Sequence, residues 1–221
     1  MEKKNTYMFS RIVVYAIGLV LLSFGITLSV RSQLGATSAA ALGQNIALLT
    51  NVSLGTTLFW VKLILVIIQL VLTKRHNHLQ ILMQVPINFI SSALVDISGW
   101  WVNSWTVETL WLKLVLMLAS IPIIALGAVF TIVPNFAPTT PDGFVQTLSE
   151  RFGWKLSNTK NAVDIIEVSA AAVLYLALRG GSLGCVHVGT ILAAIFIGRF
   201  IGLFVRLCRP YLPFMDPATR A

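Results

Sequence analysis

Residues 132–144, IVPNFAPTTPDGF, interrupt an otherwise apolar chain with three prolines, two threonines and one aspartate. Thr140 is a favourable helix N-cap, Pro141 suits the first helical position and Asp142 suits the first turn. The stretch therefore predicts that a long apolar helix ends here and that a short helix begins at once.

This short helix, in residues 139–153 (TTPDGFVQTLSERFG), is too polar to cross a membrane. It carries Asp142, Glu150 and Arg151, and a charge near the centre of a spanning helix costs up to ~3 kcal/mol. Nothing else in the segment is apolar enough to offset that cost. We therefore predict that it does not span the bilayer.

The rest of the chain is typical of an all-α polytopic membrane protein. Of 221 residues, 57% are hydrophobic and 11% are charged, whereas soluble domains carry about 25% charged residues. Six apolar runs are long enough to cross ~30 Å of hydrocarbon as helices. These predicted spans cover about 12–30, 55–72, 79–99, 110–133, 158–178 and 185–205. The first run is too long for a signal-peptide core, so we expect it to be retained.

A repeat appears when the sequence is shifted by 102 residues, which aligns ten identities between residues 25 and 72 without a gap. The identities pair Gly25 with Gly127, Thr37 with Thr139, Gln44 with Gln146, Leu54 with Leu156, Thr57 with Thr159, Val61 with Val163, Ile64 with Ile166, Val66 with Val168, Val71 with Val173 and Leu72 with Leu174. We interpret residues 1–108 and 109–221 as two copies, with short helices at 36–49 and 140–152. Three spans per copy is an odd number, so the second copy must be inverted.

The basic residues support the same topology. With six spans and a cytoplasmic N-terminus, the outer ends keep few basic residues, namely Arg31, Lys113 and Arg179. The remaining clusters, such as Lys74–Arg75, fall inside, as the positive-inside rule requires. We expect both termini to be cytoplasmic, and we attribute the net charge of +8 to these loops, not to nucleic-acid binding.

Interrupted helices at matching positions of two inverted halves are typical of substrate sites in transporters. Free N–H groups at a short helix start can hold an anion or a polar group. The candidate substrate-binding residues there are Thr37 and Ser38 in the first copy and Thr140 and Asp142 in the second. Asp142 makes a cation or zwitterion equally suitable. The alternative is that both short helices lie flat on the membrane surface.

Ionisable residues within predicted spans are the other candidates for substrate binding. Lys62 and Asp164 occupy equivalent positions of the repeat, and both should approach the midplane, where they could pair. Glu167 shares a helix face with Asp164, so one carboxylate could carry a proton or a cation. The alternatives are a structural ion pair, or a Lys62 that reaches back to the membrane surface. Arg31, directly before the first broken segment, is a gate candidate.

Other polar residues are ambiguous or uninformative. Asp96, with Asn88 and Gln84 earlier in the same run, is compatible with a polar lining or with the membrane interface. We predict no metal site, because the His76–His78 triplet has no accompanying ligands. We predict no cofactor and no enzymatic activity, because no nucleophile–base pair is recognisable.

The chain resembles the YczE-like membrane proteins, related to the YyaS/YitT group, in three stretches. These are FGITLSVRSQLGATS (24–38), NVSLGTT (51–57) and HVGTILAAIFIGRFIGLF (187–204). The resemblance implies a multi-pass protein of the bacterial inner membrane. The family often has a Pro-Trp-Asp element, where this chain has Ala39–Ala41 in the first copy and Pro141–Gly143 in the second. A site that depends on it would therefore survive in one half.

Together these patterns favour a small secondary transporter or permease in the lipid bilayer that moves a small polar or charged solute. The rival hypothesis is a non-transporting scaffold or accessory protein for a partner complex, in which the buried charges are structural. A homodimer is compatible with either hypothesis.

Overall fold

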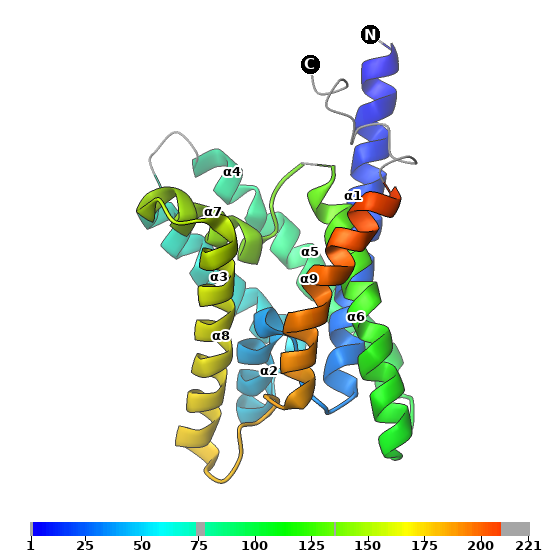
Figure 1. The fold of residues 1–221 in the computed structure, drawn as a ribbon, viewed down its shortest axis with the longest axis vertical. Coiled ribbons are helices and arrows are strands. Elements are labelled where there is room, and N and C mark those ends of the chain that lie inside the picture. The colour runs from blue at the N-terminus through cyan, green and yellow to red at the C-terminus, as the bar shows by residue number, and fades with distance from the viewer. Residues whose placement is uncertain (1, 74–77, 135, 209–221) are drawn as a thin grey trace.

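The chain folds into a bundle of α-helices in a computed structural model that describes residues 2–73, 78–134 and 136–208 (Figure 1). The helices of the described residues are α1 (Glu2–Arg31), α2 (Ser38–Thr50), α3 (Leu54–Leu72), α4 (His78–Leu82), α5 (Gln84–Asn103), α6 (Leu110–Ile132), α7 (Thr140–Phe152), α8 (Leu156–Arg179) and α9 (Val188–Cys208). In this part of the chain, six helical segments are long and apolar enough to cross a membrane, with α4 and α5 together forming one of them. The predicted all-α polytopic fold is confirmed.

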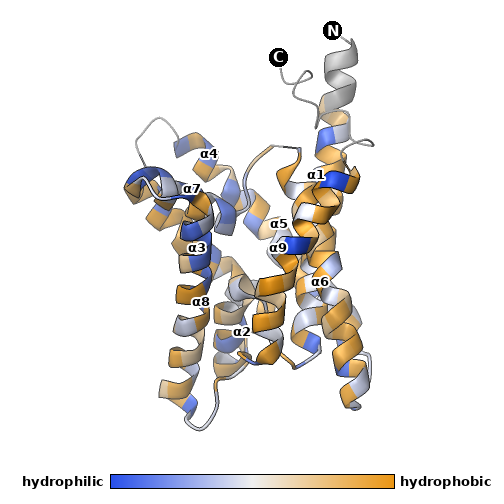
Figure 2. Cartoon of the chain, in the orientation of Figure 1, coloured by the Kyte–Doolittle hydropathy of each residue, from blue (hydrophilic) through white to orange (hydrophobic). Residues whose placement is uncertain are grey.

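Apolar residues cover the sides of the bundle, and hydrophilic residues gather toward its ends and on α7 (Figure 2). Successive spanning helices run in opposite directions, so the start of α1 and the end of α9 lie at the same end of the bundle (Figure 1). This is the arrangement that an even number of spans requires.

The core of the bundle is the antiparallel pair α1 and α6, which pack closely because small residues face each other. A methyl group added to Gly25 would lie 2.5 Å from Cγ1 of Ile124, and one added to Gly127 would lie 2.6 Å from the backbone nitrogen of Leu22. Close approach of this kind, with glycine at the crossing, is typical of membrane helix pairs.

The same packing occurs twice, once in each half. α1 packs on α5 as α6 packs on α9, α2 packs on α8 as α7 packs on α3, and α2 packs on α3 as α7 packs on α8. The exception is that α3 packs on α5 whereas α8 and α9 barely touch. The fold is thus two inverted repeats that exchange their short helices: each short helix packs on a long helix of the other half.

The short helices match residue for residue. Both α2 and α7 have 13 residues and begin and end at positions 102 apart. Their N-caps, Thr37 and Thr139, have the same extended backbone, and their C-caps, Asn51 and Gly153, are both left-handed. The expectation that Thr140 caps its helix was wrong by one residue: Thr139 is the N-cap and Thr140 is the first helical residue.

Other helix boundaries differ slightly from the prediction. The third span is broken at Met83, because Pro86 in the first turn of α5 has no N–H to continue the helix from α4. The last span begins at Val188 and not at residue 185, because residues 184–187 still belong to the loop, which turns at Gly184 with a positive φ of 65°.

Candidate functional site

Two cavities lie at opposite ends of the bundle, and they are equivalent in the repeat. The larger, of about 970 Å³, is lined by the end of α1, by α2 and by the end of α5. The smaller, of about 530 Å³, is lined by the end of α6, by α7 and by the start of α8. Five lining positions correspond at an offset of 102: Val30 and Ile132, Gly35 and Ala137, Ala36 and Pro138, Gln44 and Gln146, Leu54 and Leu156.

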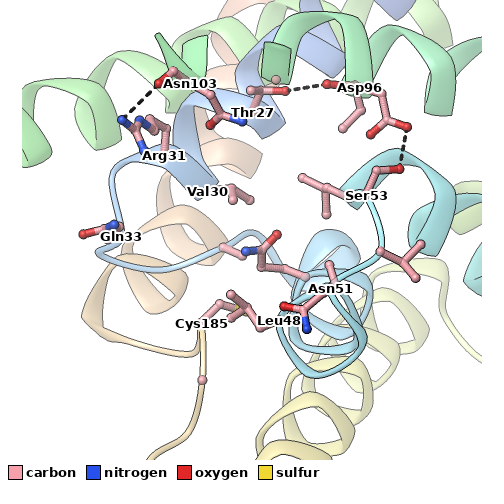
Figure 3. Close-up of a pocket in the computed structure, with 18 of the residues that line it drawn as sticks. Thr27, Val30, Arg31, Gln33, Leu48, Asn51, Ser53, Asp96, Asn103 and Cys185 are labelled. Carbon is pink, nitrogen blue, oxygen red and sulfur yellow. Dashed lines mark hydrogen bonds between the residues drawn. The ribbon is translucent and has the colours of Figure 1, made fainter. Parts of the chain in front are cut away.

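The gate candidate Arg31 lies at the wall of the larger cavity (Figure 3). Its guanidinium donates hydrogen bonds to the carbonyl oxygens of Asn103, at 3.4 Å, and of Trp105. Beside it, Lys113 donates to the side-chain oxygen of Gln33 at 2.7 Å. Arg31 thus ties the end of α1 to the end of α5 and to the segment that follows it, at the wall of this cavity.

Asp96 lies on another side of the larger cavity and holds the start of α3 (Figure 3). Its carboxylate accepts hydrogen bonds from the Ser53 hydroxyl at 2.8 Å and from the Gly55 N–H at 2.7 Å. A carboxylate at a helix N-terminus is stabilised by the helix dipole. In the sequence, Ser53 and Gly55 indicate the start of a helix. They do not show which acidic side chain contacts that start.

The smaller cavity contains the start of α7. The Thr139 hydroxyl donates to the Asp142 carboxylate at 2.7 Å, and Lys160 of α8 also lines the cavity. Lys160 in turn forms an ion pair with Asp164 at 3.0 Å, one turn along α8. Asp142 and Asp164 therefore flank a single lysine.

Ser38, the first residue of α2, donates its hydroxyl proton to the Asp164 carboxylate at 2.9 Å. Asp164 is the ninth residue of α8, so the start of α2 reaches well into the depth of the bundle. One turn further along α8, Glu167 has a buried carboxylate oxygen with no hydrogen-bond partner in the described residues. The structure thus brings Ser38, Asp164 and Lys160 into direct contact.

Lys62 does not pair with Asp164, contrary to the expectation. Its ammonium donates to the Ser91 hydroxyl at 3.0 Å on α5, whereas Asp164 is held by Lys160 and Ser38. The physical reason is that α3 and α8 each pack on both short helices, α2 and α7, and not closely on each other, while α3 also packs on α5. Equivalent positions of α3 and α8 therefore do not face each other.

Thr37 and Thr140 are buried at the starts of the two short helices. The Thr37 carbonyl accepts the Ala41 N–H at 2.8 Å, and its hydroxyl makes no capping bond. The Thr140 hydroxyl donates to the side-chain oxygen of Asn88 at 2.8 Å. Thr140 thus bonds a neutral amide, whereas its repeat equivalent, Ser38, bonds the carboxylate of Asp164.

Two buried amide contacts were missed by sequence reasoning. Gln69 and Gln84 exchange hydrogen bonds at 3.1 and 3.2 Å, and Gln69 also reaches the Thr140 carbonyl at 3.4 Å. Asn45 of α2 donates to the Ala171 carbonyl at 2.7 Å. Amides inside apolar runs were the available signal, but their partners depend on how the short helices cross over.

The chain matches a protein family over most of its length. Residues 9–206 match the model of a family described as "Family of unknown function (DUF6198)". No curated protein and no solved structure matches the chain. The resemblance to YczE-like proteins is not tested by this match and stays a prediction.

Proposed function

Because the chain belongs to the DUF6198 family of unknown function, we propose its role from its own geometry: a small secondary transporter or permease. It would move a small polar or charged solute across the bacterial inner membrane, with both termini in the cytoplasm. The observation that carries the proposal is the pair of equivalent cavities at opposite ends of two inverted repeats. Transporters with inverted repeats place their substrate sites between the halves, at interrupted helices.

The two halves differ in the volume of their cavities and in the contacts of their short helices, which supports a mechanism of alternating access. The cavity beside α2 is the larger, and the start of α2 contacts Asp164 on α8. The cavity beside α7 is the smaller, and the start of α7 contacts Asn88 on α5 instead. If the halves exchanged these two arrangements, the larger cavity would lie at the other end of the bundle. Such an exchange needs two states of similar free energy.

The acids on α8 are suited to coupling. Asp164 forms an ion pair with Lys160. The nearby Glu167 has a carboxylate oxygen without a hydrogen-bond partner in the described residues. A carboxylate in this position can take up a proton or a cation when the cavity opens. Ser38, at the start of α2, would sense that change through its bond to Asp164.

The test is uptake into proteoliposomes that contain the purified full chain. Labelled amino acids, polyamines and small carboxylates are offered under a proton gradient and under a sodium gradient. We expect uptake of at least one class, and its loss in Asp164→Asn and Glu167→Gln with the thermal stability retained. Glu150→Gln is the matched control, because Glu150 is exposed and its one hydrogen bond among the described residues is to Gln146, one turn earlier in α7.

The scaffold hypothesis makes the opposite forecast. No class would be taken up under either gradient, and both α8 substitutions would lower the melting temperature without any other effect. That result would refute the proposal.

A further inference from the structure

Lys62 is a charged residue inside a spanning helix with no acidic partner. In the described residues its ammonium has one hydrogen-bond partner, the neutral Ser91 hydroxyl at 3.0 Å, and no carboxylate lies within ion-pair distance. An ammonium offers three N–H donors. An unpaired charge in apolar surroundings is costly unless a counter-charge or a set of hydrogen bonds compensates it.

The helix that faces Lys62 presents further unused donors. Asn88, Ser91 and Ser92 lie at positions i, i+3 and i+4 of α5, so they share one face within a single turn. Asn88 and Ser92 are 3% and 4% exposed, and the Asn88 amide nitrogen and the Ser92 hydroxyl have no hydrogen-bond partner in the described residues. A buried polar group without a partner costs about 1–3 kcal/mol.

Thr140, in the second half of the chain, fixes the orientation of the Asn88 side chain. The Thr140 hydroxyl donates to the Asn88 side-chain oxygen at 2.8 Å. The oxygen is therefore occupied, and the amide N–H groups remain as donors. Ser91 accepts from Lys62 and donates to the backbone carbonyl of Asn88 at 3.1 Å, so Lys62 meets α5 in the turn that carries Asn88 and Ser92.

We propose that Lys62, Asn88 and Ser92 form a binding site for a small monovalent anion between α3 and α5, beside the start of α7. All three supply donors, and one positive charge matches one negative charge. The anion would neutralise Lys62 and satisfy the two neutral donors, which removes the cost of leaving them unpaired. The carboxylates of Asp142, Asp164 and Glu167 lie on α7 and α8 and are not bonded to this group. Asp96 lies one turn beyond Ser92 on α5, and its carboxylate is bonded to Ser53 and Gly55.

This inference rests on the proposed function in one respect, because it names the charge of the solute or co-transported ion. Two sources have the required chemistry: a halide such as chloride, or a small carboxylate such as acetate. The position beside Thr140, the first residue of α7, would link occupancy of the site to the seating of that short helix.

The test measures the melting temperature of the purified full chain by tryptophan fluorescence. Sodium chloride or sodium acetate replaces sodium gluconate at constant ionic strength and pH. We expect one or both anions to raise the melting temperature in a saturable way, because a ligand that binds only the folded state stabilises it. Chloride alone would indicate a halide site, and acetate alone a carboxylate site.

Variants then assign the effect to this group. Lys62→Gln should abolish the anion-dependent shift, and Ser92→Ala should weaken the apparent affinity by about tenfold, as expected for a lost hydrogen bond to a charged ligand. Lys113→Gln is the control, because Lys113 bonds Gln33 at the far end of the bundle and should keep the wild-type shift. If Lys62→Gln does not fold, the affinity of Ser92→Ala decides.

Two results would overturn the site: neither anion stabilises the wild-type chain, or Ser92→Ala and Lys62→Gln respond as the wild type does. The outcome is independent of transport. Anion binding without uptake in proteoliposomes would refute only the transporter, and uptake by a chain that neither anion stabilises would refute only the site.

Discussion

Gly25 of α1 and Gly127 of α6 occupy reciprocal positions of one helix crossing, 102 residues apart in the chain. Gly25 faces Ile124, and Gly127 faces Leu22, which is the repeat equivalent of Ile124. When residue i contacts j and the equivalent of i contacts the equivalent of j, the two halves are related by a two-fold axis. The repeat in the sequence is therefore also a symmetry of the central packing.

The two glycines predict unequal effects of alanine. At Gly127 the added methyl group meets backbone atoms of Leu22 and Gly18, which cannot move aside, whereas at Gly25 the nearest atom belongs to the Ile124 side chain. We expect Gly127→Ala to cost about 3 kcal/mol of stability and Gly25→Ala about 1 kcal/mol, the range for overpacked interiors. Thermal or denaturant unfolding in detergent measures this. Gly198→Ala, where nothing lies within 4 Å, is the control, and an equal loss at all three sites would contradict the prediction.

Asp96 predicts a capping effect across helices. Its carboxylate accepts from Gly55 N–H and the Ser53 hydroxyl at the start of α3. We expect Asp96→Asn to lower stability by about 1 kcal/mol and Asp96→Ala by about 2 kcal/mol, as for the loss of an N-cap. Melting temperatures check this against Glu108→Gln, an exposed acid with no hydrogen bond in the described residues. Unchanged melting for Asp96→Ala would show that Asp96 does not cap α3.

Asn45 predicts that α2 depends on one buried amide. The side chain is fully buried, donates to the Ala171 carbonyl at 2.7 Å and accepts the Cys185 N–H at 2.8 Å. Asn45→Ala removes these bonds and a third, to the Leu183 carbonyl at 3.3 Å, and leaves the Cys185 N–H without its partner, so we expect a loss of about 2–4 kcal/mol. Thr147→Ala is the matched control at the equivalent position of α7 and should change stability by less than about 1 kcal/mol. Proteolysis and thermal unfolding can both measure the difference.

Cys185, in the segment between α8 and α9, predicts a pH-dependent reactivity. Burial raises the pKa of its thiol from 9.0 to about 12, and the thiol donates to the Ala41 carbonyl at 3.3 Å. The thiolate is the reactive form, so alkylation at pH 8 should be about a thousand-fold slower than for an ordinary thiol. The unfolded thiol ionises near pH 9, so the folded state should lose this contribution to stability between pH 9 and about 12.

Mass spectrometry of iodoacetamide-treated protein checks the prediction. The same chain unfolded in detergent is the reference, in which Cys185 should react at the ordinary rate. Rapid labelling of Cys185 in the folded protein at pH 8 would show that the thiol is not held as described. In Cys185→Ala, the fall in stability above pH 9 should be smaller than in the wild type.

The topology predicts opposite labelling of two exposed positions. Thr109 precedes α6 at one end of the bundle, and Lys155 precedes α8 at the other. In a background of Cys185→Ala and Cys208→Ala, a cysteine at 109 should react with an impermeant maleimide from outside intact cells. A cysteine at 155 should react only in inverted vesicles. α6 is the one span expected between the two positions, so labelling of both from the same side would contradict this topology and the inverted arrangement.

The sequence by itself determined the number of spans, the duplication and the limits of both short helices. These features depend on local chemistry: apolar length decides which segments cross, and proline, threonine and glycine decide where the helices break. The prediction of short helices at 36–49 and 140–152 lies within two residues of α2 and α7. The inversion followed because an odd number of spans allows no other arrangement.

Only the tertiary structure decided which polar groups meet. Lys62 and Asp164 are equivalent in sequence, yet one faces Ser91 and the other Ser38 and Lys160. The exchange of short helices is symmetric, but the packing of the long helices is not: α3 packs on α5, whereas its equivalent α8 barely touches α9. A repeat in the sequence fixes equivalence between residues, whereas contact depends on the rotation and depth at which helices pack.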